Sequence, residues 1–167
     1  MNPGNHPILN IDDVPLEDWR HGEKYQARMV QVGRLLGARK LGCRLVVLPP
    51  GKAAWPLHAH HVNEEMFFII QGTGLLRCAG KTHAIRAGDI IAVPPGPDTP
   101  HQIQNDSDAD LHYLCVSTME APDIVEMPDS GKINIMAGSP PGGDRSARTL
   151  SVCLPLDAAM DYWEGEE

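Results

Sequence analysis

Short apolar runs separated by turn residues fill the middle of the chain. They predict a series of short strands, expected at 27–32, 41–48, 64–71, 75–78, 82–86, 90–93, 101–104 and 111–118. Glycine, proline, asparagine and aspartate occupy most of the positions between these runs. Short strands with turn signals about every 8–12 residues are typical of a sandwich or a barrel. No helical patterns alternate with the strands, so a parallel α/β sheet is disfavoured.

The strand expected at 64–71 is apolar on both faces. Side chains alternate along a strand, so Phe67 and Ile69 share one face with Glu65. The other face carries three apolar side chains, Met66, Phe68 and Ile70. One face is therefore expected to line a barrel interior. The other requires a second sheet, the chain's own terminal segments or a partner subunit to cover it.

The two ends of the chain have a different character. Residues 1–26 are polar and irregular, and residues 120–167 are interrupted by five prolines, although short edge strands are expected at 132–136 and 149–154. This organisation predicts an N-terminal arm at 1–26, a barrel core at 27–119 and a C-terminal extension at 120–167. The extension is expected to pack on the barrel or on a partner.

Composition narrows the function classes. A length of 167 residues fits one domain, and 16 glycines with 15 prolines favour strands and turns over long helices. The net charge of −8 argues against a nucleic-acid partner. No apolar run approaches the ~20 residues needed to span a bilayer, and the first residues lack the pattern of a signal peptide.

The cysteines point to a reducing compartment. Four of them are widely spaced, at 43, 78, 115 and 153, and no Cys-x-x-Cys pair occurs. A thiolate zinc site or a redox pair is therefore not expected. Strand-like surroundings favour small buried apolar side chains, so we expect a cytoplasmic protein.

The candidate chemistry lies in a histidine-rich segment. His58 and His60 are two positions apart, which puts both imidazoles on one face of a strand. Glu65 opens the next strand, and an antiparallel return would bring it alongside. Two histidines and a carboxylate on one face form a first-row transition-metal pattern. A His-x-His pair also occurs in solvated surface turns, but the apolar strand after Glu65 directs that carboxylate toward a core.

Here the sequence resembles the cupin superfamily. The first cupin motif is matched by Gly51, His58, His60, Glu65 and Gly72. Six residues separate Gly51 from His58 where the motif has five, so a longer loop is expected there.

The second cupin motif follows in the same order along the chain. It is matched by Gly88, Pro94, Gly96, His101 and Asn105. Four residues precede His101 where the motif has two, which again lengthens a loop without changing the order of the motif residues. Together the two motifs cover residues 51–105, about a third of the chain.

The resemblance implies both a fold and a metal site. The fold is an all-β, cupin-type conserved β-barrel (a double-stranded β-helix or jelly roll) with irregular N- and C-terminal arms. The implied metal ligands are His58, His60, Glu65 and His101. Glu64 is the rival carboxylate, but strand alternation places Glu65 with the inward-facing residues. The cofactor is a divalent transition metal ion, which could be Fe, Mn, Ni, Zn or Cu, because all accept imidazole and carboxylate ligands.

Three functions remain open. The sequence is similar to small single-domain bacterial cupins that are often labelled as sugar-phosphate isomerases, which implies a metal-dependent enzyme on a small polar metabolite. A metal-dependent dioxygenase and a non-catalytic binding or sensing module are the alternatives. No catalytic residue is assigned. Lys52, Arg77 and Arg86 are cations considered for a phosphate group, and each also fits an ordinary solvated charge.

The apolar second face of strand 64–71 also predicts an assembly. Each buried side chain of this kind contributes about 1.5–3 kcal/mol, so an exposed stripe would favour aggregation. We therefore expect a homodimer in which the terminal segments cross or cap the partner's sheet.

Overall fold

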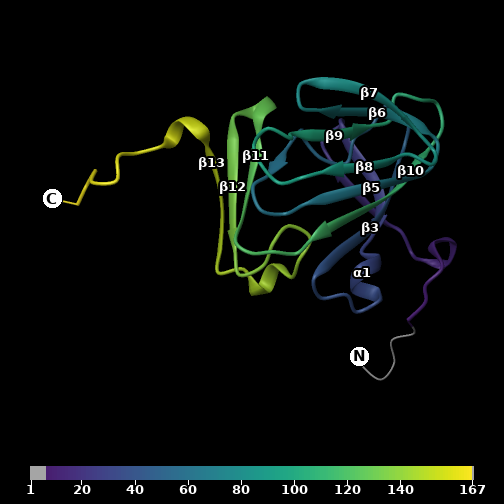
Figure 1. Ribbon diagram of the computed structural model, residues 1–167, viewed down its shortest axis with the longest axis horizontal. Coiled ribbons are helices and arrows are strands. Elements are labelled where there is room, and N and C mark those ends of the chain that lie inside the picture. The colour runs from purple at the N-terminus through teal and green to yellow at the C-terminus, as the bar shows by residue number, and fades with distance from the viewer. Residues whose placement is uncertain (1–6, 167) are drawn as a thin grey trace.

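Strands dominate the computed structural model, which describes residues 7–166 (Figure 1). The largest sheet has six strands in the order β1-β2-β3-β10-β5-β8. Its strands are β1 (Glu17–His21), β2 (Tyr25–Val30), β3 (Leu41–Leu48), β10 (Leu111–Thr118), β5 (Glu65–Gln71) and β8 (Ile90–Val93). All their pairings are antiparallel.

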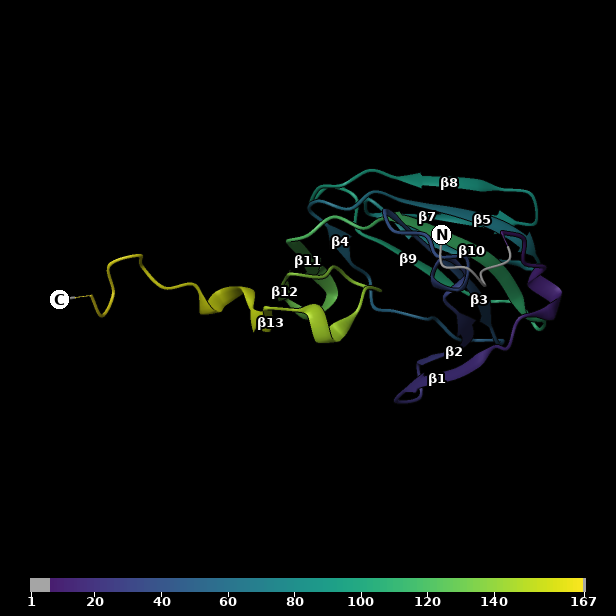
Figure 2. The same ribbon diagram turned by 90° about the horizontal axis from the view of Figure 1, so that it is seen from below.

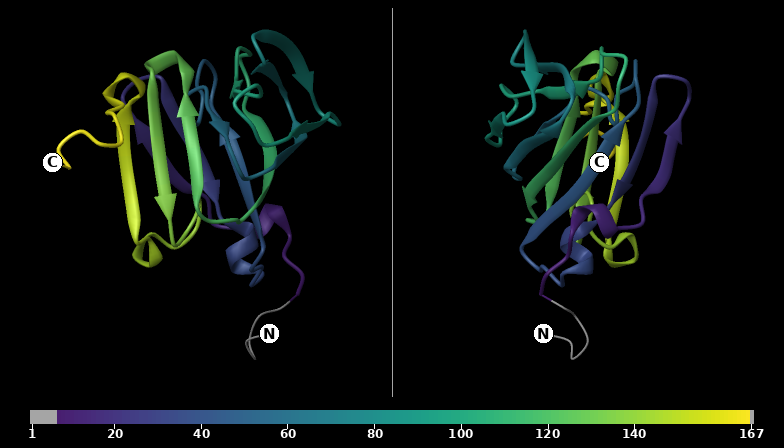
Figure 3. Two further views of the ribbon diagram at one scale, coloured as in Figure 1. Left: turned by 60° about the vertical axis from the view of Figure 1, so that its left-hand side comes forward. Right: turned by 90° about the vertical axis from the view of Figure 1, so that its right-hand side faces the viewer.

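Two smaller sheets complete the molecule. The first has the order β7-β6-β9, from β7 (Lys81–Arg86), β6 (Thr73–Cys78) and β9 (His101–Gln104). The second has the order β13-β12-β11-β4, from β13 (Leu150–Pro155), β12 (Lys132–Ala137), β11 (Asp123–Met127) and β4 (Ala59–His60). Figure 3 shows β11, β12 and β13, coloured green to yellow, side by side at one side of the molecule.

The prediction of an all-β jelly roll is confirmed. The strands expected at 41–48, 90–93, 101–104 and 111–118 have those same bounds in the structure. The expected strand at 27–32 is displaced. β2 ends at Val30, and Val32 instead begins the short helix α1 (Val32–Leu35). Gly33 allows this helix to lie against β3, since a Cβ there would be 2.9 Å from the Cys43 amide nitrogen.

The terminal segments are more regular than their composition predicts. Residues 17–21 form β1, which pairs with β2 around a turn at Gly22. The ring of Trp19 in β1 lies 6.2 Å from that of Trp55, which packs against the core. Residues 123–155 contribute the three strands β11, β12 and β13. β11 pairs with β4, so these strands form a sheet that extends beyond the barrel. Figures 1 and 2 show residues after β13 running away from the rest of the molecule.

The hydrophobic core fills the space between the six-stranded and three-stranded sheets. Its members include Val46, Leu48, Phe67, Ile69, Leu76, Ile103, Leu111 and Tyr113. The alternation predicted for β5 is confirmed for this core, since Phe67 and Ile69 are 5% and 0% exposed. Met66 and Phe68, on the opposite face, are 45% and 42% exposed.

Gly72 turns the chain between β5 and β6. Its φ of +87° lies in the left-handed region that favours glycine. A Cβ there would also be 2.6 Å from the Asp110 carbonyl oxygen. The short helices, which include 3-10 turns at Ile11–Asp13, Pro128–Ser130, Arg145–Ala147 and Leu156–Ala158, lie at connections. No helix within residues 7–166 is long and apolar enough to cross a membrane.

Two leucines that each open a strand differ in burial, and this predicts different losses in the free energy of unfolding when each is replaced by alanine. Leu111 of β10 is fully buried, whereas Leu41 of β3 is 53% exposed. We expect Leu111→Ala to lower the free energy of unfolding by about 2–5 kcal/mol, because it leaves a cavity in the core. Leu41→Ala should cost less than about 1 kcal/mol. Urea denaturation measures both, and equal losses would contradict the assigned core.

Candidate metal centre

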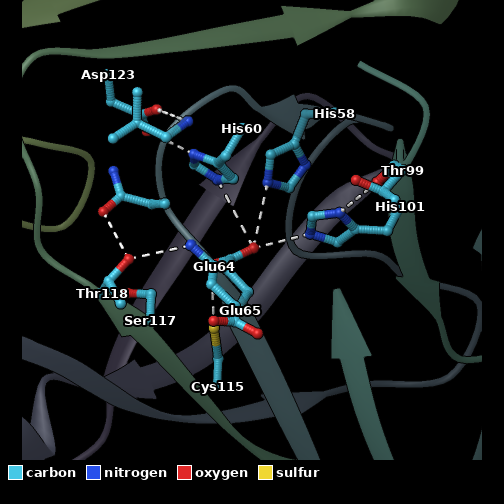
Figure 4. A network of polar contacts seen from close by, with 12 residues as sticks. His58, His60, Glu64, Glu65, Thr99, His101, Cys115, Ser117, Thr118 and Asp123 are labelled. Carbon is cyan, nitrogen blue, oxygen red and sulfur yellow. Dashed lines mark hydrogen bonds and ion pairs between the residues drawn. The ribbon is translucent and has the colours of Figure 1, made fainter. Parts of the chain in front are cut away.

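Three different parts of the fold bring four side chains together at one end of the barrel. His58 and His60 come from β4 and the residue before it, Glu65 opens β5, and His101 opens β9. A backbone bridge between His58 and His101 joins β4 to β9 at this point. Figure 4 shows the three imidazole rings turned toward the Glu65 carboxylate.

The three rings converge on a single oxygen atom. The Nε2 atoms of His101, His60 and His58 lie 2.8, 3.7 and 4.0 Å from Glu65 Oε2. Ligand atoms of His58, His60 and Glu65 all lie within 4.8 Å of one another. The group is sheltered, because His101 and His60 are 2% and 7% exposed.

Each histidine is anchored through its other ring nitrogen. The Nδ1 atom of His58 donates to the Pro56 carbonyl oxygen at 2.9 Å, and that of His101 donates to the Thr99 carbonyl oxygen at 3.2 Å. His60 Nδ1 donates to Asp123 Oδ2 at 2.6 Å. Because carbonyls and carboxylates only accept, Nδ1 carries the proton in each ring. Each Nε2 is thereby directed toward the centre, where it can bind a metal ion when it carries no proton.

The electrostatics favour a bound cation. Burial alone would raise the pKa of Glu65, but the hydrogen bond with His101 and the nearby imidazoles outweigh it and hold that pKa at about 2. Burial, together with the neighbouring His101, lowers the pKa of His58 to about 4. The centre thus holds an ionised carboxylate beside a neutral His58 imidazole at pH 7.

Asp123 is a part of the centre that the sequence did not reveal. It opens β11, is fully buried, and also accepts from the Val62 amide at 3.3 Å. Burial acts to raise its pKa, but the hydrogen bonds from His60 and Asn63 outweigh this and lower it. An ionised Asp123 makes the His60 imidazole more basic and therefore a stronger ligand for a metal ion. No local pattern marks this residue, because its partner lies 63 positions away.

The donor set fits a divalent transition metal ion. Three imidazole nitrogens and one carboxylate oxygen are ligands that Fe, Mn, Ni, Zn and Cu accept. At 2.8 Å, the lone-pair atoms of His101 and Glu65 require a cation between them, either a proton or a metal ion. The anchored Nδ1 atoms are also the arrangement that metal-ligating histidines adopt.

The rival residues lie outside this cluster. Glu64 is exposed, and its backbone amide donates to Thr118 Oγ1 at 3.0 Å. His61, which has the opposite strand alternation to His58 and His60, pairs with Glu126 of β11 at 2.7 Å. Asn105, from the second motif, is buried, and its amide donates to the carbonyls of Leu48 and Ala109. The Asn105 side chain therefore stabilises a loop and does not belong to the candidate metal centre.

Two more residues near the centre, Cys115 and Arg44, were not predicted from the sequence to belong to it. The Cys115 thiol on β10 donates to Glu65 Oε1 at 3.4 Å, and burial raises its pKa well above the ordinary value. Arg44 on β3 shares an alternation with the buried Val46 and Leu48. The alternation of side chains along this strand could have predicted from the sequence that Arg44 is a charged residue at an inward position.

A small depression opens onto the centre from outside. Its lining is mostly polar and comprises His60, Asn63, Glu65, Ser117, Thr118 and Pro141. Pro141 belongs to the segment between β12 and β13, so the C-terminal part of the chain forms one wall of the opening. Two of the residues in the centre, His60 and Glu65, are thus reachable from this side.

Comparisons with known proteins agree with this geometry. A family model described as a cupin domain matches residues 44–117. An oxalate-binding protein from Thermotoga maritima is 32% identical over 95 residues, which cover 57% of this chain and 75% of that protein. The chain belongs to the cupin family. An uncharacterized protein from Methanocaldococcus jannaschii is 38% identical over 61 residues, and the match spans 36% of this chain and only 47% of that protein.

Solved structures share the fold over most of the chain. A protein from Acidithiobacillus ferrooxidans, provisionally assigned as a sugar phosphate isomerase, has a TM-score of 0.78 at 22% identity and covers 92% of this chain and 94% of its own. A sugar phosphate isomerase of the cupin superfamily from Silicibacter pomeroyi has a TM-score of 0.76 at 21% identity, with 92% and 95% covered. A Thermotoga maritima protein described as a predicted oxalate decarboxylase has a TM-score of 0.58 at 25% identity, with 66% and 97% covered.

The low pKa of His58 predicts an acid-sensitive centre in the metal-free protein. Between pH 6.5 and about 4 the unfolded chain protonates this histidine and the folded chain does not. The contribution of His58 to stability is therefore complete above pH 6.5 and is lost as the pH falls toward 4. Urea denaturation in the presence of a chelator should show a steeper acid loss for the unmodified chain than for His58→Gln. Parallel pH profiles would contradict the assigned environment of His58.

Proposed function

We propose that this cupin is a metal-dependent enzyme acting on a small polar metabolite. The proposal assigns His58, His60, Glu65 and His101 as the ligands of one divalent transition metal ion. It rests on one observation above all, namely that three histidines with anchored Nδ1 atoms direct Nε2 toward the same carboxylate oxygen. A surface cluster of solvated side chains would have no need of three separate anchors.

The chain's own residues define what such a site does. The carbonyls of Pro56 and Thr99 and the carboxylate of Asp123 fix the orientation of the rings. The apolar core below, with Phe67 5.5 Å from the His101 ring, keeps water from reaching the centre through the barrel. A bound divalent ion would supply Lewis-acid polarisation of a ligand carbonyl or hydroxyl oxygen. The depression that reaches His60 and Glu65 has a mostly polar lining, which suits a polar ligand.

Sugar-phosphate isomerisation is the specific activity that the sequence resemblance suggests, and it stays a prediction. The two similar structures assigned to that activity share only 22% and 21% identity with this chain, a level that supports the fold. A screen of sugar phosphates with the metal-reconstituted protein tests it. Turnover would support isomerisation, whereas oxygen uptake with Fe(II) would favour a dioxygenase.

The second candidate is non-catalytic binding of a small dicarboxylate. The relative named as an oxalate-binding protein favours it, because it is 32% identical and 75% of its length is matched. Binding without turnover across the screen would support this candidate over the enzyme.

The metal assignment predicts which substitutions empty the site. Replacing His60 or His101 by Ala should lower metal affinity more than about 100-fold, since even outer partners of ligands are worth about 10–100-fold. Glu65→Gln should weaken binding by removing the charge, whereas the exposed Glu64→Gln is the matched control and should bind normally. Elemental analysis after dialysis and calorimetric titration with Zn(II) measure both. Unchanged metal content in the two histidine variants would refute the assignment.

We also propose a cytoplasmic homodimer. Met66 and Phe68 of β5 and Ile90 of β8 are 45%, 42% and 69% exposed, and Phe68 lies directly opposite Ile90 in the strand register. Figure 2 shows β8 at the outside of the molecule. The side chains of Met160 and Trp163 near the C-terminus are 70% and 71% exposed and supply apolar surface for a partner. The cysteines within the described residues are all free, as a reducing compartment allows.

The dimer is tested by its mass. Light scattering at micromolar concentration should give about twice the chain mass of 18.2 kDa. Phe68→Asp should shift the mass to that of one chain or make the protein insoluble, because it places a charge in the apolar contact. Leu35→Asp, at a residue 44% exposed on α1, is the control and should leave the dimer intact. A single-chain mass for the unmodified protein would overturn the proposal.

A further inference from the structure

One cation points into the barrel beside the candidate metal centre. Arg44 of β3 lies on the same face as Val46 and Leu48, both of which are fully buried. The strand register places it opposite Cys115 of β10, which lies opposite Phe67 of β5. Arg44 therefore lies on the inner face of the barrel wall, where it is half-buried, although the chain is acidic and most of its charges are solvated.

The register also places Arg44 near Glu65. Glu65 of β5 lies opposite Ser117 of β10, one interior row away from the row that holds Cys115 and Arg44. Adjacent strands are about 4.8 Å apart, so β3 and β5 lie about 10 Å apart across β10. The Glu65 charge favours the charged form of Arg44. Arg44 and Glu65 are therefore neighbours across one strand of the sheet.

Arg44 has no carboxylate partner. Two other arginines are paired with carboxylates, Arg28 with Asp110 and Arg77 with Asp129, each at 2.8 Å. Within residues 7–166, no carboxylate forms an ion pair with Arg44. Burial lowers the pKa of this guanidinium, which reflects the cost of keeping a cation away from water.

The groups that do surround Arg44 hold it in place without neutralising it. Its guanidinium carbon lies 5.0 Å from the centroid of the Trp55 ring, a stacking contact that orients the planar group. The Gln31 amide oxygen, turned toward the guanidinium, accepts from Nε at 3.2 Å. An arginine carries five N–H donors, so donors remain for a ligand.

Arg44 borders the opening of the centre. Pro141 lines the depression that leads to His60 and Glu65. The next residue, Gly142, lies against the guanidinium, since a Cβ there would be 3.4 Å from Arg44 Nη2. Residues 141–142 therefore lie beside both the depression and the Arg44 guanidinium.

The other cations considered for an anionic group are engaged elsewhere. Arg77 is held by Asp129 on the outside of the barrel, and Lys52 Nζ donates to the Glu23 carbonyl oxygen at 2.7 Å. Arg86 is exposed on β7.

We propose that Arg44 binds the oxyanion group, a carboxylate or a phosphate, of the molecule that occupies the centre. This inference rests on the proposed function, because it takes the histidine cluster as the place where the rest of that molecule binds. It restricts the ligand class to small anionic metabolites, and a neutral sugar or polyol of the same size is excluded as the preferred ligand.

Calorimetric titration of the Zn(II)-loaded protein with oxalate, inorganic phosphate and the neutral polyol erythritol tests this assignment. The unmodified chain should bind at least one of the two anions and should not bind erythritol. Arg44→Gln should weaken the binding of that anion by at least about tenfold, as expected for a charge-assisted pair. The surface variant Arg77→Gln is the matched control and should bind as the unmodified chain does. Which anion binds distinguishes a carboxylate ligand from a phosphate ligand.

Arg44→Lys keeps the proposal testable if Arg44→Gln fails to fold. Lysine preserves the charge but not the planar fork, so affinity should fall to a smaller degree. Elemental analysis of the same samples separates this inference from the proposed function. Retained zinc with anion affinity unchanged in the folded variants, or no anion bound by the unmodified chain, would overturn the role of Arg44. Absence of zinc throughout, with anion affinity still dependent on Arg44, would overturn the metal assignment alone.

Discussion

The hydrogen bonds on the outer nitrogens of three histidines set the chemistry of this protein. Each Nδ1 is held by a fixed acceptor, so each Nε2 is directed to the same point beside Glu65. The strongest acceptor is Asp123, which comes from β11 and ties the C-terminal sheet to the centre. Residues 120–167 are therefore not a passive extension. They orient His60 and, through Pro141, form part of the entrance.

The barrel supports this arrangement in two ways. Apolar side chains exclude water on one side of the histidine cluster, and charged side chains lie on another side. Phe67 and Tyr113 close the interior below the histidines. Arg44 brings a guanidinium that pairs with no carboxylate of residues 7–166 close to the ionised Glu65, so this part of the barrel offers both an acceptor for a metal ion and a donor for an anion. The proposed anion would lie between this guanidinium and a metal ion, an arrangement that would offset the cost of partly burying the Arg44 charge.

Much of the fold could be predicted because β-strands leave a strong local signal. The run at 41–48 and the glycine and proline turns around 90–93 gave strand bounds that the structure confirms. Alternation along 65–71 also placed Glu65, and not Glu64, on the inward face. The role of Asp123 depends on a pairing between distant segments, β4 and β11, which no local pattern encodes. The same alternation rule predicts an inward position for Arg44, although the apolar residues around it in 41–48 indicate only a core strand. The identity of the metal and the dimer remain predictions.

X-ray absorption spectroscopy of the zinc-loaded protein tests the central claim most directly, because it reports the atoms bound to the metal. The account predicts nitrogen and oxygen ligands at about 2.0–2.2 Å with the multiple-scattering signature of three imidazoles. It also predicts no sulfur ligand, since the Cys115 thiol is held as a hydrogen-bond donor to Glu65. A sulfur ligand at about 2.3 Å, or fewer than three imidazoles, would contradict the account.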